Sequence, residues 1–172
     1  MMLAEVGKMK RFLIMVAVAA LAVPVLAQGP SPKKAFETLK KLAGTWEMKG
    51  PNGETMRVIY KVSGAGSSLI ETQFPGEAHE MVSVYHMDGN DLLMTHYCAA
   101  GNQPTMKYKP GKDANILFFD FVKGTNMKLA DMHIHTAKYF LKGADEIKSD
   151  WTGWMKGKPA GTTSFELKRI SK

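Results

Sequence analysis

Apolar and polar residues alternate with the period of a β-strand along most of this chain, and only one stretch has the period of a helix. In that stretch the apolar residues follow helical spacing: Ala35, Phe36, Leu39 and Leu42. The preceding Ser31-Pro32 is a suitable helix start. The pattern predicts a short helix over Lys33–Leu42, of a size to cover the mouth of a barrel.

From Gly44 onward, runs rich in Val, Ile, Thr, Tyr, Phe and Trp are separated by turn signals such as Asn52-Gly53 and Asp88-Gly89. Because the links have hairpin length and no long Greek-key return is visible, we expect an all-β fold, an antiparallel up-and-down barrel of about ten strands with a short N-terminal helix. A closed barrel also leaves no exposed edge. The predicted strands are Thr45–Lys49, Glu54–Val62, Ser68–Phe74, Ala78–Met87, Leu92–Ala99, Thr105–Lys109, Asn115–Val122, Met132–Leu141, Glu146–Met155 and Thr162–Ile170.

The N-terminal segment has the pattern of a secretory signal peptide. Basic residues precede an apolar run from Phe12 to Leu26, and Val25-Leu26-Ala27 is a small-x-small cleavage pattern. We therefore predict a signal peptide over residues 1–27, a linker over 28–32 and a barrel domain over 33–172. Cleavage near Ala27 predicts export to the periplasm or secretion. The apolar run is shorter than the ~20 residues of a membrane span, so no membrane span is expected in the mature chain.

Charge and cysteine content narrow the class of protein. Cleavage would remove three basic residues and Glu5, which lowers the net charge from +7 to +5. The remaining lysines are scattered rather than gathered beside aromatic residues, so we expect no nucleic-acid partner. With Cys98 as the single cysteine, no intramolecular disulfide can form and the fold must depend on a hydrophobic core.

A helix followed by Gly44-Thr45-Trp46 and a meander of strands ending in a basic residue resembles the calycin superfamily, which includes lipocalins, fatty-acid-binding proteins and nitrobindin-like haem barrels. The phrase from Leu93 to Pro104 resembles uncharacterised exported bacterial members. The resemblance implies a barrel closed at its floor by Trp46, with Lys168 or Arg169 stacked on the indole ring. Attraction between a cation and an aromatic face gives that pairing a physical basis.

Two strand faces carry residues of metal-ligand type. Met94, His96 and Cys98 share one face, and Asp131, His133 and His135 share another. Met, Cys and His would suit copper, and two His with a carboxylate would suit zinc or iron. The alternatives are that Met94 and Cys98 belong to the core and that the two histidines are hydrogen-bonded interior or surface residues.

We therefore carry three functional hypotheses. The first is a carrier or sensor of a small, largely apolar ligand, with these candidate contacts: His96, Tyr97, His133, His135, Tyr139 and Trp151. The second is a haem- or metal-binding barrel that uses His96, His133 and His135, with haem or a transition metal as cofactor. The third is an interaction module whose barrel is filled. No nucleophile-elbow, P-loop, dinucleotide or H-E-x-x-H pattern indicates an enzyme, and the sequence requires no cofactor.

Overall fold

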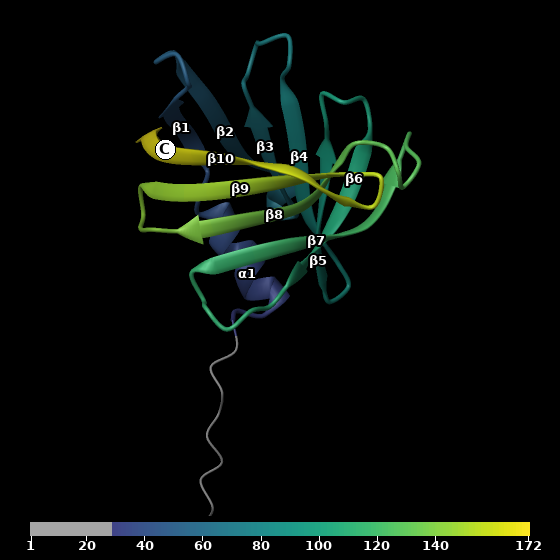
Figure 1. Ribbon diagram of the computed structural model, residues 1–172. Coiled ribbons are helices and arrows are strands. Elements are labelled where there is room, and N and C mark those ends of the chain that lie inside the picture. The colour runs from purple at the N-terminus through teal and green to yellow at the C-terminus, as the bar shows by residue number, and fades with distance from the viewer. Residues whose placement is uncertain (1–28) are drawn as a thin grey trace, which may run out of the picture.

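The computed structural model describes residues 29–172, so the predicted signal peptide lies outside the described residues. Ten antiparallel strands follow one short helix, and each strand pairs with its neighbours in sequence until β10 closes the barrel against β1 (Figure 1). The prediction of an up-and-down barrel with ten strands is confirmed. The elements are α1 (Pro32–Lys40), β1 (Gly44–Lys49), β2 (Thr55–Ser63), η1 (Gly64–Gly66), β3 (Ser68–Gln73), β4 (Met81–Asp88), β5 (Asp91–Tyr97), β6 (Gln103–Lys109), β7 (Ile116–Thr125), β8 (His133–Leu141), β9 (Glu146–Met155) and β10 (Lys158–Ser171).

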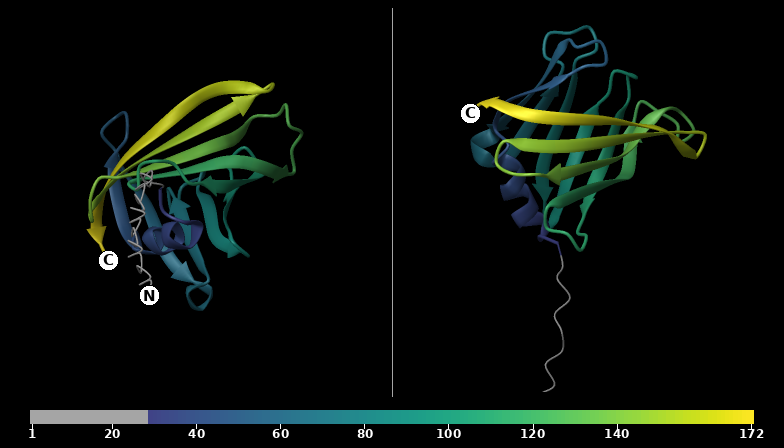
Figure 2. Two further views of the ribbon diagram at one scale, coloured as in Figure 1. Left: turned by 90° about the horizontal axis from the view of Figure 1, so that it is seen from below. Right: turned by 60° about the vertical axis from the view of Figure 1, so that its left-hand side comes forward.

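Helix α1 covers one end of the barrel, as its amphipathic pattern predicts. The side chain of Ser31 caps the helix and Pro32 occupies its first position. The helix buries Ala35, Phe36 and Leu39. Seen along the barrel, α1 sits at the centre of this opening (Figure 2). We call this the helix end and the opposite opening the cavity end.

Trp46 and Arg169 close the barrel at the helix end. The Trp46 indole is fully buried and donates to the carbonyl of Leu42 at 2.8 Å. The Arg169 guanidinium lies 4.2 Å from the ring centroid and donates to the carbonyls of Lys41, Leu42 and Ala43, which follow the helix. Arg169, and not Lys168, therefore fills the basic position that the resemblance implies.

Gly44 is required where the chain enters β1. Its φ of +131° is strained for any residue with a side chain, and a Cβ there would collide with the backbone oxygen of Ser171. The glycine and the tryptophan of the Gly44-Thr45-Trp46 motif thus serve the same closure. Gly44 leaves room for the backbone of β10, and the Trp46 side chain fills the floor of the barrel.

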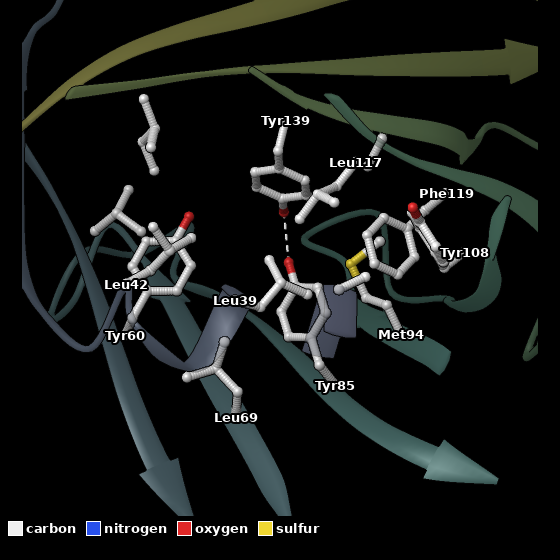
Figure 3. Packing of buried hydrophobic residues seen from close by; sticks show 14 of the residues in the cluster. Leu39, Leu42, Tyr60, Leu69, Tyr85, Met94, Tyr108, Leu117, Phe119 and Tyr139 are labelled. Atoms are coloured by element: carbon white, nitrogen blue, oxygen red, sulfur yellow. Dashed lines mark hydrogen bonds between the residues drawn. The ribbon is translucent and has the colours of Figure 1, made fainter. Parts of the chain in front are cut away.

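The helix end is densely filled by large apolar and aromatic side chains from most strands. Fully buried members include Leu39, Trp46, Tyr60, Leu69, Tyr85, Leu92, Met94, Met106, Tyr108, Leu117, Phe119 and Tyr139. Figure 3 shows part of this cluster, with Tyr85, Phe119 and Tyr139 near its centre. These side chains pack in edge-on and tilted aromatic pairs, for example Tyr85 with Phe119 at 5.7 Å. A core of this extent explains how the fold is held without a disulfide.

The cavity end is less tightly closed. β1 pairs with β10 only over Thr45–Glu47, after which the β1–β2 hairpin and β10 diverge (Figure 1). The free edge of β10 beyond this seam carries Lys158 and Pro159 and a bulge before Gly161, features that discourage pairing with another chain. Within residues 29–172, no helix is long and apolar enough to cross a membrane.

Candidate ligand cavity

A cavity of about 530 Å³ lies between the diverging strands at the cavity end. Its walls are mainly apolar, with three methionines and three aromatic rings. A volume of this size falls within the ~300–1,000 Å³ range of small-molecule sites. The lining residues are Met48, Lys49, Gly50, Pro51, Met56, Gln73, Phe74, Met81, His96, Ile134, Trp151, Thr163, Ser164 and Phe165.

Two aromatic side chains of the cavity lining pack against each other, face to edge. Phe74 follows β3 and Phe165 comes from β10, and their ring centroids are 5.6 Å apart. Phe74 has a left-handed backbone, with φ +57°, which is unusual for a bulky residue. This conformation turns the chain out of β3, while the ring stays buried against Phe165.

His96 and Trp151 lie together on the cavity wall. Their ring centroids are 5.0 Å apart, and both side chains are buried. His96 Nδ1 lies 3.0 Å from the hydroxyl oxygen of Ser83, which is fully buried on β4. Burial lowers the pKa of His96 to about 4, so its imidazole is neutral near pH 7.

Beneath the cavity lies a polar cluster that we call the Glu71 cluster: Tyr60, Glu71, Gln73, Tyr85 and Tyr139. The Glu71 carboxyl is fully buried and accepts hydrogen bonds from Tyr60 at 3.1 Å, from Tyr139 at 2.9 Å and from Tyr85. The side-chain nitrogen of Gln73 donates to the same carboxyl at 3.0 Å. The Tyr85 and Tyr139 hydroxyl oxygens also lie within hydrogen-bond distance of each other (Figure 3), so two phenol hydrogens are shared among these two oxygens and Glu71 Oε2.

Burial is the main influence on the acidity of the Glu71 cluster. It raises the pKa of Glu71, and the four donated hydrogen bonds offset part of that rise. Burial and the nearby carboxyl raise the pKa of each of the three tyrosines well above its usual value. The phenols therefore stay protonated and act as donors. Sequence reasoning missed Glu71 and Gln73, although both share a strand face with Leu69.

Three of the predicted ligand contacts come together inside the barrel. His96 and Trp151 line the cavity, and Tyr139 lies 5.9 Å from Trp151 in the Glu71 cluster. Tyr97 points outward and is half exposed, as strand alternation from His96 requires. Whether any of these side chains contacts a ligand stays a prediction.

The other two predicted contacts, His133 and His135, are absent from the cavity lining and pack with Phe121 and Trp154, with His133 only 1% exposed. His133 pairs directly with Trp154, and opposed residues of an antiparallel ladder share a face. A bulge between Ile134 and Thr136 shifts the register, so the histidines do not share the inward face of Tyr139. His135 stacks on Trp154 at 3.9 Å and its Nδ1 bonds to His133 Nε2 at 3.0 Å.

The residues of metal-ligand type do not converge on one point. Met94 and His96 share one face of β5, as predicted, and this face points inward with Leu92. Cys98 follows the end of β5, and Asp131 is exposed in the β7–β8 loop. Across residues 29–172, no group of three or more His, Cys, Asp or Glu side chains is placed to hold a metal ion. His96 is the one candidate that lines the cavity, and its partner Ser83 bears on whether it can bind a haem iron.

The hydrogen bond with Ser83 favours one tautomer of the neutral His96 ring. Buried Ser83 has no other side-chain hydrogen bond in the described chain, so donation from its hydroxyl to Nδ1 uses the hydroxyl hydrogen, whereas acceptance from Nδ1–H would leave that hydrogen without a partner. The remaining proton of the neutral ring then sits on Nε2, which offers a donor to the cavity in place of a lone pair. The arrangement fits a hydrogen-bonding role for His96 better than haem ligation.

Comparison with known proteins adds no identification. The chain matches no protein-family model, and a search of curated proteins finds no match. A closed ten-stranded antiparallel barrel with one short helix fits a calycin-like barrel in general terms.

Proposed function

We propose that this protein is an exported carrier or sensor that binds one small, largely apolar molecule at the cavity end of a calycin-like barrel. The observation that carries the proposal is the apolar cavity of about 530 Å³, which has His96 and Gln73 as buried polar groups in its wall. Burial of a ligand against these side chains would remove apolar surface from water, at roughly 25 cal/mol per Å². The same cavity argues against an interaction module with a filled interior.

A neutral, apolar fluorophore tests the proposal directly. N-phenyl-1-naphthylamine should bind the folded protein with one-to-one stoichiometry and gain fluorescence as it leaves water. Ile134→Trp fills space in the cavity wall and should weaken binding by about tenfold or more, because a steric conflict of about 1.4 kcal/mol has that effect. Ile170→Trp makes the same change at an exposed position and should leave the affinity unchanged.

Two results would contradict binding in the cavity. One is the absence of saturable fluorescence with the wild-type protein. The other is equal affinity in the two tryptophan variants. Native mass spectrometry of protein purified from its source would in addition show whether a ligand is carried, as an excess over the mass of the chain.

Export rests on the signal-peptide pattern of residues 1–27. Mass measurement of the protein expressed in full should show a chain that begins at Gln28. An intracellular product that keeps residues 1–27 would contradict export.

A further inference from the structure

Two polar groups of the cavity wall have fixed hydrogen-bonding roles, and those roles define the ligand more narrowly. Gln73 and His96 are each 1% exposed, and both line the cavity. The inference drawn from them rests on the proposed function, since it concerns the ligand of the same cavity.

The Glu71 cluster fixes the direction of the Gln73 amide. Its Nε2 donates to Glu71 Oε1 at 3.0 Å. With the amide reversed, a carbonyl oxygen would face a carboxyl oxygen that already accepts from Tyr60, which is a repulsive contact. Gln73 therefore turns Oε1, an acceptor, away from the Glu71 cluster.

Ser83 fixes the proton of His96 in a similar way. Donation from the buried hydroxyl to Nδ1 is the arrangement that uses the hydroxyl hydrogen, and with it the neutral imidazole carries its own hydrogen on Nε2. With the pKa of His96 lowered to about 4, this neutral donor persists through physiological pH. Trp151 packs beside the ring and restricts its rotation.

Both free atoms remain open to the cavity. Neither Oε1 of Gln73 nor Nε2 of His96 bonds to another side chain or backbone group in residues 29–172. Among the described residues, Oδ1 of Asn102 is the sole side-chain oxygen or nitrogen that is both fully buried and unbonded. The two unbonded atoms of Gln73 and His96 are therefore accessible. The wall thus presents one acceptor and one neutral donor to the space that a ligand would occupy.

We propose that the cavity selects neutral molecules with an apolar body and one group that both donates and accepts a hydrogen bond, namely a hydroxyl or a primary carboxamide. Such a group can donate to Gln73 Oε1 and can accept from His96 Nε2. A carboxylate would find His96 uncharged and would meet both the Gln73 carbonyl and the Glu71 carboxyl behind it. An ammonium group would face the N–H of His96. The only cationic side chain in the lining is Lys49, which bonds to Thr55 at 2.8 Å.

Four naphthalene compounds of similar size test this selection by calorimetric titration: naphthalene, 2-naphthol, 2-naphthamide and 2-naphthoate. The naphthol and the amide should bind about tenfold or more tightly than naphthalene, because each can add a hydrogen bond to a buried partner, and about 1.4 kcal/mol corresponds to tenfold. The carboxylate should bind more weakly than the naphthol by at least a similar factor. Preference for the carboxylate, or equal binding of all four, would overturn the selection while leaving the proposed function intact.

Variants show whether the two named side chains cause the preference. Gln73→Met and His96→Phe should each reduce the ratio of naphthol to naphthalene affinity by several-fold. Thr163→Val removes a different hydroxyl from the same wall and should leave the ratio unchanged. The ratio is measured within one protein, so a partial loss of folded protein does not affect it. If none of the four compounds binds the wild-type protein, the proposed function and the selection both fail.

Discussion

The two ends of this barrel are made from the same strands but packed in opposite ways. At the helix end, α1, Trp46 and the aromatic core fill the interior, and Arg169 joins the last strand to the residues after the helix. At the cavity end, β1 and β10 part after three paired positions and leave about 530 Å³ between them. The comparison shows how one barrel can be both a stable core and a container.

The Glu71 cluster lies at the boundary between these two ends. Its tyrosines belong to the packed core, whereas Gln73 belongs to the cavity wall. A buried carboxyl carries a desolvation cost that apolar residues in its place would avoid. Because Glu71 holds the Gln73 amide, the cluster orients a polar side chain of the cavity wall. Mutations can separate this role from the stability of the core.

The largest effect is expected from Glu71→Leu, which removes the shared acceptor at the boundary. The Tyr60 hydroxyl and the Gln73 side-chain N–H would lose their shared acceptor, and Tyr85 and Tyr139 would keep only the bond to each other. Each lost hydrogen bond of a buried group costs about 1–3 kcal/mol. We expect urea unfolding at pH 7 to show a decrease in stability on the order of 4 kcal/mol. Glu71→Gln keeps one acceptor and should lose less, and the exposed Glu166→Leu should have almost no effect. A loss below about 1 kcal/mol in Glu71→Leu would contradict the role given to this cluster.

A matched pair of methionine truncations compares the ends directly. Met94 is fully buried in the core, and Met56 is partly buried and lines the cavity. Met94→Ala should destabilise the fold by about 3 kcal/mol because it leaves a void, whereas Met56→Ala enlarges an existing space and should cost under about 1 kcal/mol. Both values come from denaturant unfolding at equal protein concentration. Equal losses would mean that the cavity end is packed as tightly as the core.

The smallest effect concerns pH and His96. The folded protein resists protonation of this ring until the pH approaches 4, whereas the unfolded chain takes up the proton near pH 6.5. Stability should therefore fall as the pH is lowered from about 6.5 towards 4, by about 2 kcal/mol at pH 5. The raised pKa of Glu71 acts in the opposite direction, so the contribution of His96 is the difference in slope between the wild-type protein and His96→Phe. Identical slopes would show that His96 is protonated as easily in the folded state as in the unfolded state.

The fold could be predicted from the sequence because its signals are local. Turn residues, β-branched runs and the Gly44-Thr45-Trp46 motif each lie within a few residues, and the structure confirms the helix and all ten strands close to their predicted bounds. The helix ends at Lys40 rather than Leu42. The Arg169 guanidinium donates hydrogen bonds to the carbonyls of the residues that follow the helix. A contact of that separation has no local signature.

The candidate site was harder to predict because its members meet across the barrel. Tyr139 reaches Glu71 from 68 positions away, and nothing near Glu71 marks it as an inward residue. On β3 the buried face carries Glu71 and Gln73, and the other face carries the less polar Ile70 and Thr72. The alternation of polar and apolar residues therefore cannot show which face is the interior. His133 and His135 lie outside the cavity lining for a different reason, since a single bulged position in β8 changes which residues face inward.

The bonds of Arg169 also have a consequence for the order in which the chain folds. Three of its carbonyl partners precede it by 126 to 128 residues, so the floor of the barrel is joined by segments from opposite ends of the described chain. During synthesis, Trp46 emerges early and has no guanidinium to pack against until β10 follows. Contacts of such long separation form slowly because the intervening loop loses entropy when it closes. Closure of the floor is therefore a late event. Until then, the face of the Trp46 indole and the carbonyls that follow α1 stay exposed to water.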